Sequence, residues 1–381
     1  MKLLHTSDWH LGMVLRGGMT YCDDQRFIID KICQIAVREK VDGIIIAGDI
    51  FDKSIASSEA IRIYDEVMTY ICSGLGIPVY LVAGNHDGAE RISQCSELLK
   101  KSGLYIAGAI SDRIHTVNSG DVDIYLLPWI STDKVKSIYP DKADQVYSME
   151  DAYRVVLDEY RKTFVKGHKN ILAAHAFIVN AETSVSDRAA EVGSATMVGT
   201  SVFEGFDYVA LGHLHGPQDI NDRIRYSGSI MAYSFGKEEK QEKSVTIIDT
   251  DDLSHKIIPL PQLHKRTTIS GTYREIMEAG YDEEIIDGYV KLEVTDSYVG
   301  MDSIASLREK YKNLLEITSR AFDKDDEKIT LTMEEFENIN TDPESVFKRY
   351  CQDTMSEAPG RHLEQLFMNA LQKYEREAGE E

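Results

Sequence analysis

Cysteine is scarce in this chain of 381 residues, and its five cysteines (Cys22, Cys33, Cys72, Cys95 and Cys351) are scattered. No two of them form a CxxC pair, which excludes a disulfide-stapled fold and a zinc site built on paired cysteines. Isolated cysteines of this kind are typical of a reducing cytoplasm, which is where we expect the protein to work.

Long apolar runs are also missing. No stretch reaches the roughly 18 residues that a membrane-spanning helix needs, so we expect no membrane association. The N-terminus turns polar at His5 and therefore does not resemble a secretory signal peptide. Apolar residues still make up 43% of the chain, which is enough for a folded core and excludes global disorder.

Basic side chains are in deficit. Lys and Arg number 42 against 64 Asp and Glu, which gives a net charge of −22. Such a chain does not bind polyanions by bulk attraction, and this argues against a simple DNA coat protein. A nucleic-acid enzyme stays open, because a local metal cluster or a partner can neutralise phosphate. The more acidic part is C-terminal, with 27 acidic and 15 basic side chains in residues 263–381.

Strand-like and helix-like patterns alternate through the first two thirds of the chain. Helical spacing of apolar residues is found around Phe27 to Ala36 and from Ile61 to Ile71. This alternation predicts an α/β layered fold. The segments that predict strands are Leu3–Leu4, Ile44–Ala47, Val79–Ala83, Ile124–Leu127, Ile171–Ala174, Tyr208–Leu211 and Val245–Ile248.

The pattern changes at Pro259 and Pro261, two prolines within three residues that suit a linker. Beyond them we expect a smaller α+β unit, with a strand over Tyr289 to Val294 and a helix over Ser303 to Leu315. The acidic tail then predicts a helix, a turn at Pro359-Gly360 and a second helix. The expected parts are residues 1–258, 263–340 and 342–381.

Five short polar segments each follow one of the predicted strands. Because open α/β sheets place ligand sites outside the carboxyl ends of their strands, the five segments are able to meet in one crevice. They are Asp8-Trp9-His10, Gly48 to Asp52, Gly84 to Asp87, His175 and Gly212 to His215. Their candidate metal ligands are Asp8, His10, Asp49, Asn85, His175, His213 and His215.

These seven ligands include no thiolate and outnumber the needs of one tetrahedral zinc, so they suit two Mn²⁺, Fe²⁺ or Zn²⁺ ions. Two ions roughly 3.5–4 Å apart hold a phosphoryl group and lower the pKa of a water molecule, which attacks phosphorus in line. Each segment alone has an ordinary explanation, such as a turn at Asn85 or a buried core histidine at His175. Their common position after strands favours a dinuclear site.

The motifs DxH, GDxxD, GNHD, a lone histidine and GHxH, in this order, resemble the calcineurin-like metallophosphoesterase superfamily. Longer stretches resemble the SbcD family, the nuclease subunits of bacterial SbcCD complexes. This resemblance implies a layered β-sandwich flanked by helices, a smaller α+β domain that caps DNA, and a helix-turn-helix tail. The matching stretches are His5–Gly12, Ala47–Asp52, Val82–Asp87, Tyr208–His215, Tyr226–Ser229 and Gln241–Ser244.

The resemblance also implies roles for the site residues. One metal ion would be held by Asp8, His10 and His215, the other by Asn85, His175 and His213, with Asp49 bridging. The implied ions are two Mn²⁺, with Mg²⁺, Fe²⁺ and Zn²⁺ as alternatives. His86 would lie over the substrate and protonate the leaving oxygen, and the Asp52 carboxylate would support it. Some nuclease relatives have histidine at the Asp52 position, so how the charge of His86 is set stays open.

The implied activity is Mn²⁺-dependent cleavage of DNA, 3′-to-5′ on double-stranded ends and endonucleolytic at hairpins and single strands, in DNA end processing, repair, replication and recombination. The implied partners are a second copy, joined by the helices near Ile61–Ile71 and Ile92–Leu99, and a coiled-coil ATPase of the SbcC kind. The tail stripe Leu363–Tyr374 fits a helix-in-groove contact with that ATPase, or packs on the chain's own cap domain.

Contacts with DNA are harder to place. Arg16 and Lys53 each follow a metal motif and are candidate phosphate contacts, against the simpler interpretation that both are solvated surface residues. The segment from Glu182 to Thr200 is rich in Ser, Ala and Gly and predicts a loop at the rim of the site. We expect the second copy and the ATPase to supply much of the contact with phosphate.

Two other functions compete. A metallophosphoesterase acting on a small-molecule or protein phosphoester would use the same site, and dependence on DNA length and end structure would separate it from a nuclease. A scaffold with a vestigial metal site would show no activity even on a generic phosphodiester. The scaffold is disfavoured because competent residues occupy every ligand position and the His86 position.

Overall fold

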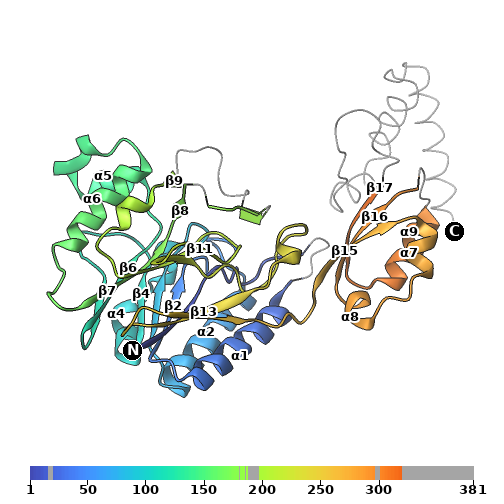
Figure 1. The fold of residues 1–381 in the computed structure, drawn as a ribbon, viewed down its shortest axis with the longest axis horizontal. Coiled ribbons are helices and arrows are strands. Elements are labelled where there is room, and N and C mark those ends of the chain that lie inside the picture. Colours follow the sequence, from blue (N-terminus) through green and yellow to red (C-terminus); the bar gives the residue numbers. More distant parts are fainter. Residues whose placement is uncertain (16–19, 180, 185, 188–196, 297–300, 320–381) are drawn as a thin grey trace, which may run out of the picture.

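Two six-stranded sheets packed face to face make up the larger unit of the molecule, residues 1–259, which we call the large unit (Figure 1). The computed structural model describes the chain except for residues 16–19, 180, 185, 188–196, 297–300 and 320–381. The strands of the first sheet lie in the order β14 (His255–Pro259), β13 (Ser244–Asp249), β1 (Lys2–Thr6), β2 (Gly43–Ala47), β3 (Val79–Val82) and β4 (Leu104–Ala107).

The second sheet has its long parallel strands in the middle. Its order is β11 (Gln218–Asn221), β12 (Ile224–Tyr226), β10 (Tyr208–Gly212), β7 (Lys169–His175), β6 (Val122–Leu127) and β5 (Thr116–Ser119). Strands β6, β7 and β10 run parallel, as do β1 to β4 in the first sheet. All seven strands that the sequence predicted in this unit are therefore present, as β1, β2, β3, β6, β7, β10 and β13.

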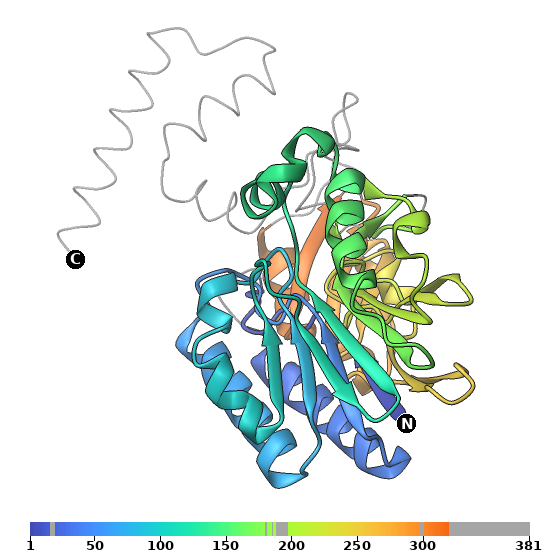
Figure 2. The same ribbon diagram turned by 90° about the vertical axis from the view of Figure 1, so that its left-hand side faces the viewer.

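Alternation along the strands explains the layers. In β2, Ile45 lies in the core between the sheets, whereas Ile44 and Ile46 lie in the core under the helices. Helices α1 (Cys22–Glu39) and α2 (Ser58–Thr69) cover the first sheet. Helices α5 (Thr132–Ile138) and α6 (Met149–Arg161) cover the second, and Figure 2 shows the two sets of helices on opposite sides of the strands. This is the layered α/β sandwich that we predicted.

Local signals account for several helix boundaries. The Ser57 side chain accepts from the N–H of Ala60 at the start of α2, and a reciprocal pair of Ser148 and Asp151 caps α6. The helix expected from Ile92 to Leu99 is wrong: the chain forms two single turns, α3 (Ala89–Ile92) and α4 (Ser96–Leu99). Cys95 interrupts them with a φ of 57°, which no helix interior accepts.

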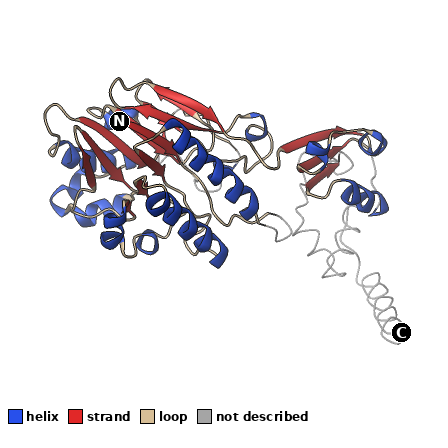
Figure 3. Ribbon diagram, turned by 90° about the horizontal axis from the view of Figure 1, so that it is seen from below, coloured by secondary structure: helices blue, strands red, loops and turns tan. Residues whose placement is uncertain are grey.

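A second, smaller unit follows the Pro259–Pro261 connection and lies beside the large unit (Figures 1 and 3). This small unit, residues 264–319, is a parallel sheet with short helices around a core of Ile269, Leu292, Leu307 and Tyr311. Its strands are β15 (Arg266–Gly271), β16 (Tyr289–Val294) and β17 (Leu314–Ser319); its helices are α7 (Tyr273–Glu278), α8 (Glu283–Ile286) and α9 (Met301–Lys310).

One expected helix of the small unit is partly wrong. We predicted a helix from Ser303 to Leu315, but α9 ends at Lys310 and Leu315 lies in β17, where its buried side chain joins Tyr289 in the apolar cluster of the large unit. The expected tail helices of residues 342–381 lie outside the described residues. Among the helices that the structure describes, none combines the length and apolar character needed to cross a membrane.

A buried carboxylate ties the two units together. Asp24, on α1, accepts a hydrogen bond of 2.8 Å from the Tyr289 hydroxyl, and His264 Nδ1 lies 3.1 Å from the same carboxylate. The Arg266 guanidinium packs against the rings of Tyr21 and Tyr289, 5.4 and 5.6 Å from their centroids. The seam between the units is therefore a specific polar and aromatic contact.

This contact predicts a measurable loss of stability. We expect Asp24→Ala to lower the free energy of unfolding by about 1–3 kcal/mol, because the Tyr289 hydroxyl and the His264 N–H lose a buried acceptor. Urea denaturation measures the loss, and limited proteolysis near residues 259–264 should be faster. The matched control is Asp23→Ala, on the exposed side of the same turn, which should change little. Equal effects of both substitutions would contradict the prediction.

Candidate metal centre

The seven candidate ligands lie together at the carboxyl ends of parallel strands from both sheets. Asp8 and His10 follow β1, Asp49 follows β2 and Asn85 follows β3. From the second sheet, His175 ends β7, and His213 and His215 follow β10. Strands of the two sheets contact one another across the core, so their carboxyl ends open onto the same crevice. The structure thus brings all seven into one site.

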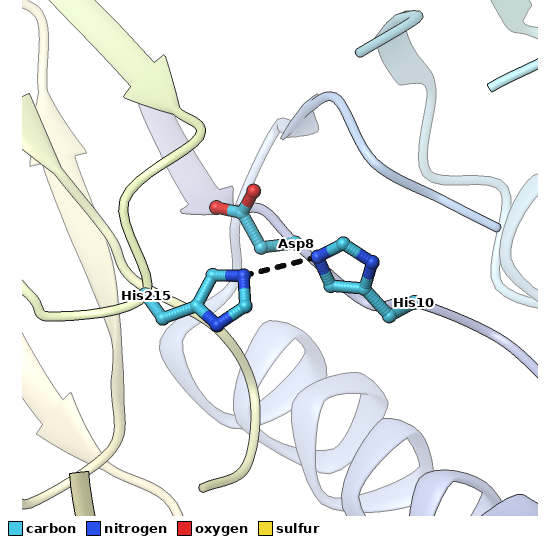
Figure 4. Close-up of side chains that lie close together, drawn as sticks. All are labelled: Asp8, His10 and His215. Atoms are coloured by element: carbon cyan, nitrogen blue, oxygen red, sulfur yellow. Dashed lines mark hydrogen bonds between the residues drawn. The ribbon is translucent and has the colours of Figure 1, made fainter. Parts of the chain in front are cut away.

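The first group of ligands is Asp8, His10 and His215, which are at most 4% exposed (Figure 4). The Nε2 atoms of the two histidines face each other at 3.1 Å. The Asp8 carboxylate accepts from the Ser7 hydroxyl at 2.5 Å and from the N–H of His213 at 3.0 Å. Burial raises the pKa of Asp8 to about 6, so a cation in this group would favour its ionised form.

The second group is Asn85, His175 and His213. Asn85 Oδ1 lies 2.9 Å from His175 Nε2 and 3.0 Å from His213 Nδ1. The two histidine nitrogens are 3.3 Å apart. Burial lowers the pKa of His213 to about 3, which keeps its imidazole neutral and able to bind a cation through a lone pair.

Asp49 lies between the two groups. Its Oδ2 is 3.7 Å from His10 Nε2 and 3.4 Å from His175 Nε2, while its Oδ1 accepts from the N–H of His86 at 2.9 Å. Burial opposes ionisation of this carboxyl, but the neighbouring His175 outweighs burial and lowers its pKa. One ionised carboxylate therefore reaches both groups.

The donor atoms of the second group fit a cation. His175 Nδ1 lies 2.9 Å from the carbonyl oxygen of Ala47, so it carries a proton and donates it. Its Nε2 then faces the oxygens of Asn85 and Asp49, which only accept. Burial lowers the pKa of His175, but Asp49 raises it to about 9. His175 Nε2 therefore carries a proton when no metal ion is bound to it. Imidazole, amide and carboxylate ligands together suit a divalent ion.

Backbone strain concentrates at the same ligands. Asp8, His10, Asp49 and His213 have φ angles of 52°, 44°, 49° and 112°. Positive φ is uncommon outside glycine and clusters at functional sites, where the surrounding structure holds it. This signal is independent of the motifs, and it marks four of the seven candidates.

Two motif glycines are required by close packing of the chain. A Cβ on Gly48 would lie 2.2 Å from His175 Nδ1, and one on Gly84 would lie 2.1 Å from Asp49 Oδ1. Gly48 also has a φ of 92°. Glycine in the GD and GN pairs therefore lets the strand ends approach closely enough to place their ligands together.

His86 contacts Asp52, but through a different atom from the one we expected. His86 Nδ1 lies 2.8 Å from the main-chain carbonyl oxygen of Asp52 and donates to it. The Asp52 carboxylate instead lies 3.9 Å from His10 Nδ1, and burial raises its pKa. The main chain therefore orients the His86 ring, which corrects the expectation that the carboxylate does so.

The structure describes one of the two candidate DNA contacts. Arg16 lies outside the described residues. Lys53 is exposed and follows Asp52 at the rim of the site, so it is accessible to a substrate. Its contact with DNA stays a prediction.

Aromatic residues that the motifs did not indicate pack against the ligands. The Trp129 ring stacks on His213 with centroids 5.4 Å apart, and Tyr233 packs edge-on against His10 and His215. The Tyr233 hydroxyl donates to the carbonyl oxygen of Trp9. A signal for Trp129 was available, since it follows strand β6 as the ligand segments follow theirs. Tyr233 follows no predicted strand directly.

Comparison with known proteins places this site in a family. Residues 1–217 match the family described as Calcineurin-like phosphoesterase. The curated SbcD subunit of the nuclease SbcCD from Staphylococcus epidermidis is 33% identical over 327 residues, which cover 85% of this chain and 86% of that protein. The chain belongs to the SbcD family of calcineurin-like phosphoesterases. This confirms the resemblance that the motifs indicated.

Further matches agree with membership of the SbcD family. The SbcD subunit of the nuclease SbcCD from Staphylococcus saprophyticus is 31% identical over 326 residues, covering 85% of this chain and 86% of that protein. Residues 264–355 match the family described as Type 5 capsule protein repressor C-terminal domain. A solved structure, TT1561 of Thermus thermophilus, has a TM-score of 0.40 and 12% identity over 68% of this chain and 98% of that one, too little to add to the assignment.

Membership of the SbcD family makes the chain a hydrolytic phosphoesterase. The family implies the use of divalent metal ions, for which the group of Asp8, His10 and His215 offers a site.

Proposed function

We propose that the chain is the DNA nuclease subunit of an SbcCD-like complex and hydrolyses DNA phosphodiesters with two Mn²⁺ ions. The observation that carries the proposal is the convergence of two ligand groups on Asp49, with His86 beside them. Asp8, His10 and His215 would hold one ion, and Asn85, His175 and His213 the other. Bound ions would neutralise phosphate charge and lower the pKa of a water molecule.

The chain's own residues supply orientation and a proton. Asp49 fixes the main chain of His86 through its N–H, and the carbonyl of Asp52 fixes the His86 ring. As an imidazolium, His86 keeps its Nδ1 proton on the Asp52 carbonyl and would deliver its Nε2 proton to the sugar oxygen that leaves as its bond to phosphorus breaks, which returns the ring to the neutral form. Glycines 48 and 84 keep the strand ends close enough for these groups to act on one phosphate.

DNA is the substrate that we propose, and a cavity beside the ligand groups offers room for it. A cavity of about 690 Å³ lies between the two units and is lined by Tyr233, which also packs on His10 and His215. Lys240, Arg266 and Lys291 line it as well. Glu239, Glu293 and Glu316 line it too, so the cavity carries as many acidic as basic side chains and does not by itself select DNA. The choice of DNA over a small phosphoester rests on the relatives, which are named as nucleases.

The test is cleavage of duplex DNA labelled at its 3′ or 5′ end, together with a hairpin substrate. We expect Mn²⁺-dependent, 3′-to-5′ degradation of ends and cutting at the hairpin, both stopped by a chelator. The chain should be assayed alone and with its ATPase partner. Turnover of a small aryl phosphoester without any cleavage of DNA in either arrangement would favour the alternative, a phosphoesterase for small-molecule or protein phosphoesters.

The parts of the chain would divide the work within the complex. The names of the relatives describe one component of a complex, and we assign the ATPase contact to the tail, residues 342–381, and DNA capping to residues 263–340. The described cysteines are all free, in keeping with the predicted cytoplasmic location. That location stays a prediction, as do end processing, repair and recombination as the setting.

A homodimer is proposed through the surface around α2. Ile55 is 72% exposed and Ile61 is 52% exposed, and Leu98 of α4 is 65% exposed. The proposed interface would cover these exposed apolar side chains. We expect Ile61→Arg to convert a dimer into a monomer in sedimentation, because a buried unpaired charge is costly. Ile257→Arg, an exposed position on β14, is the control and should leave the dimer intact.

A further inference from the structure

His215 has a side-chain partner that the motifs do not contain. Ser186 Oγ lies 2.7 Å from His215 Nδ1, on the side of the ring opposite to the Nε2 that faces His10. The same hydroxyl bonds to Oε1 of Glu238. Ser186 comes from the segment that the sequence predicted as a loop at the rim, and Glu238 follows Tyr233 on a short 3₁₀ turn.

Each hydrogen bond between Glu238, Ser186 and His215 has a defined donor and acceptor. The Glu238 carboxylate receives three further donors: the Ser234 hydroxyl, the N–H of Tyr233 and the ammonium of Lys243. A carboxylate among such donors only accepts, so the single proton of Ser186 is donated to Glu238. The Ser186 oxygen is then left with lone pairs alone, and its contact with His215 requires a proton on Nδ1.

We infer that Ser186 and Glu238 form a relay that holds His215 in its Nδ1-protonated tautomer and so turns a bare Nε2 towards the metal-ligand group. Both residues are positioning residues, since they act on the metal through His215. The inference rests on the metal site of the proposed function, and it adds two residues that orient one of its ligands.

No other acceptor takes the place of Ser186 in the described structure around His215. Asp187 Oδ1 lies 3.7 Å and Glu238 Oε1 lies 3.8 Å from His215 Nδ1, beyond hydrogen-bond range. Asp187 Oδ1 instead accepts from the main-chain N–H of His215 at 3.0 Å. The orientation of the imidazole therefore depends on one hydroxyl group.

A buried ion pair holds the far end of the relay in place. Glu238 and Lys243 are 0% and 2% exposed. The Lys243 ammonium donates to Glu238 at 3.1 Å, to the carbonyl oxygen of His215 at 2.8 Å and to Ser229 at 2.9 Å. All three ammonium protons are used. The bonds to Glu238 and to the carbonyl oxygen of His215 hold the relay carboxylate next to the main chain of the ligand. The pair thus sets the position of Glu238 relative to His215.

His215 differs from His175 and His86 in the kind of group that orients its ring. Main-chain carbonyls orient those two rings, and no side-chain substitution removes a carbonyl. His215 depends on side chains, so its tautomer is open to mutation. Glu238→Gln is the obvious variant, but it leaves the Lys243 charge buried without a counter-ion and threatens folding. Ser186→Ala removes only the relay hydroxyl and leaves the ion pair intact.

The experiment measures Mn²⁺ binding to the full chain by electron paramagnetic resonance, together with the ¹⁵N shifts of its histidines in the metal-free state. Ser186→Ala should weaken the affinity for one of the two ions about 10- to 100-fold and should move His215 from a single tautomer to a mixture. Ser186→Thr keeps the hydroxyl and should restore both readouts. Ser234→Ala removes a donor to the same Glu238 atom without touching His215, and should bind Mn²⁺ like the wild type.

Two results would overturn the relay. One is unchanged affinity and tautomer in Ser186→Ala, and the other is an equal loss in Ser186→Ala and Ser234→Ala, which would indicate a general structural effect. Failure of the proposed function is a separate outcome, since it would appear as a wild-type chain that binds no Mn²⁺ or, once loaded with Mn²⁺, cleaves no DNA.

Discussion

Asp49→Asn should abolish both Mn²⁺ binding and DNA cleavage. The Asp49 carboxylate faces His10 at 3.7 Å and His175 at 3.4 Å, so the substitution removes negative charge from both ligand groups at once. Residues that only support a metal ligand cost about 10- to 100-fold when they are lost, and a bridging carboxylate should cost more. The amide has nearly the same size and keeps an oxygen for the N–H of His86, so the fold should survive.

The measurement is the number of Mn²⁺ ions bound per chain, paired with cleavage of end-labelled duplex. Asp123→Asn is a matched control, because Asp123 is also a buried carboxylate in the large unit, 5% exposed, that contacts a histidine. Its partner is His168, near the opposite ends of the strands, so this variant should bind two ions. Retention of two ions and of full activity by Asp49→Asn would rule out the bridging role.

His86→Ala should lower the turnover of DNA by about 10²- to 10⁴-fold while leaving Mn²⁺ binding unchanged, as expected for loss of a general acid. The sugar oxygen of DNA is a poor leaving group and needs a proton. Nitrophenolate leaves without one, so a nitrophenyl phosphodiester should show a much smaller defect with the same variant. This difference between the two substrates separates proton delivery from a loss of substrate binding.

The control for His86 follows from its contact with the main chain. Asp52→Asn keeps the carbonyl that accepts from His86 Nδ1, so it should retain activity within about tenfold of the wild type, the worth of one hydrogen bond. A defect as large as that of His86→Ala would show that the Asp52 carboxylate acts directly. Equal defects of His86→Ala on both substrates would show that His86 does not deliver the proton.

The strands and the ligand positions were predictable from the sequence because both depend on local patterns. A β-branched run such as Ile44–Ala47 is a buried strand in almost any context, and a polar motif directly after it lies at the carboxyl end. Errors arose where a local pattern was ambiguous. Leu315 continues a helical spacing but lies in β17, and the apparent helix from Ile92 to Leu99 breaks at Cys95.

The atoms that complete the site were decided by tertiary structure alone. His86 Nδ1 donates to the main-chain carbonyl of Asp52 rather than to its carboxylate, because the main chain between β2 and α2 directs that carbonyl towards the His86 ring. Ser186, Glu238 and His215 come from separate segments, and no spacing connects them. Their contact exists because packing of the elements brings the segments after the short strand β8 (Phe177–Ile178), β10 and β12 to one edge, where buried donors and acceptors must find partners. Periodicity in a sequence determines which face of an element is buried, but which polar groups meet there depends on how the elements pack.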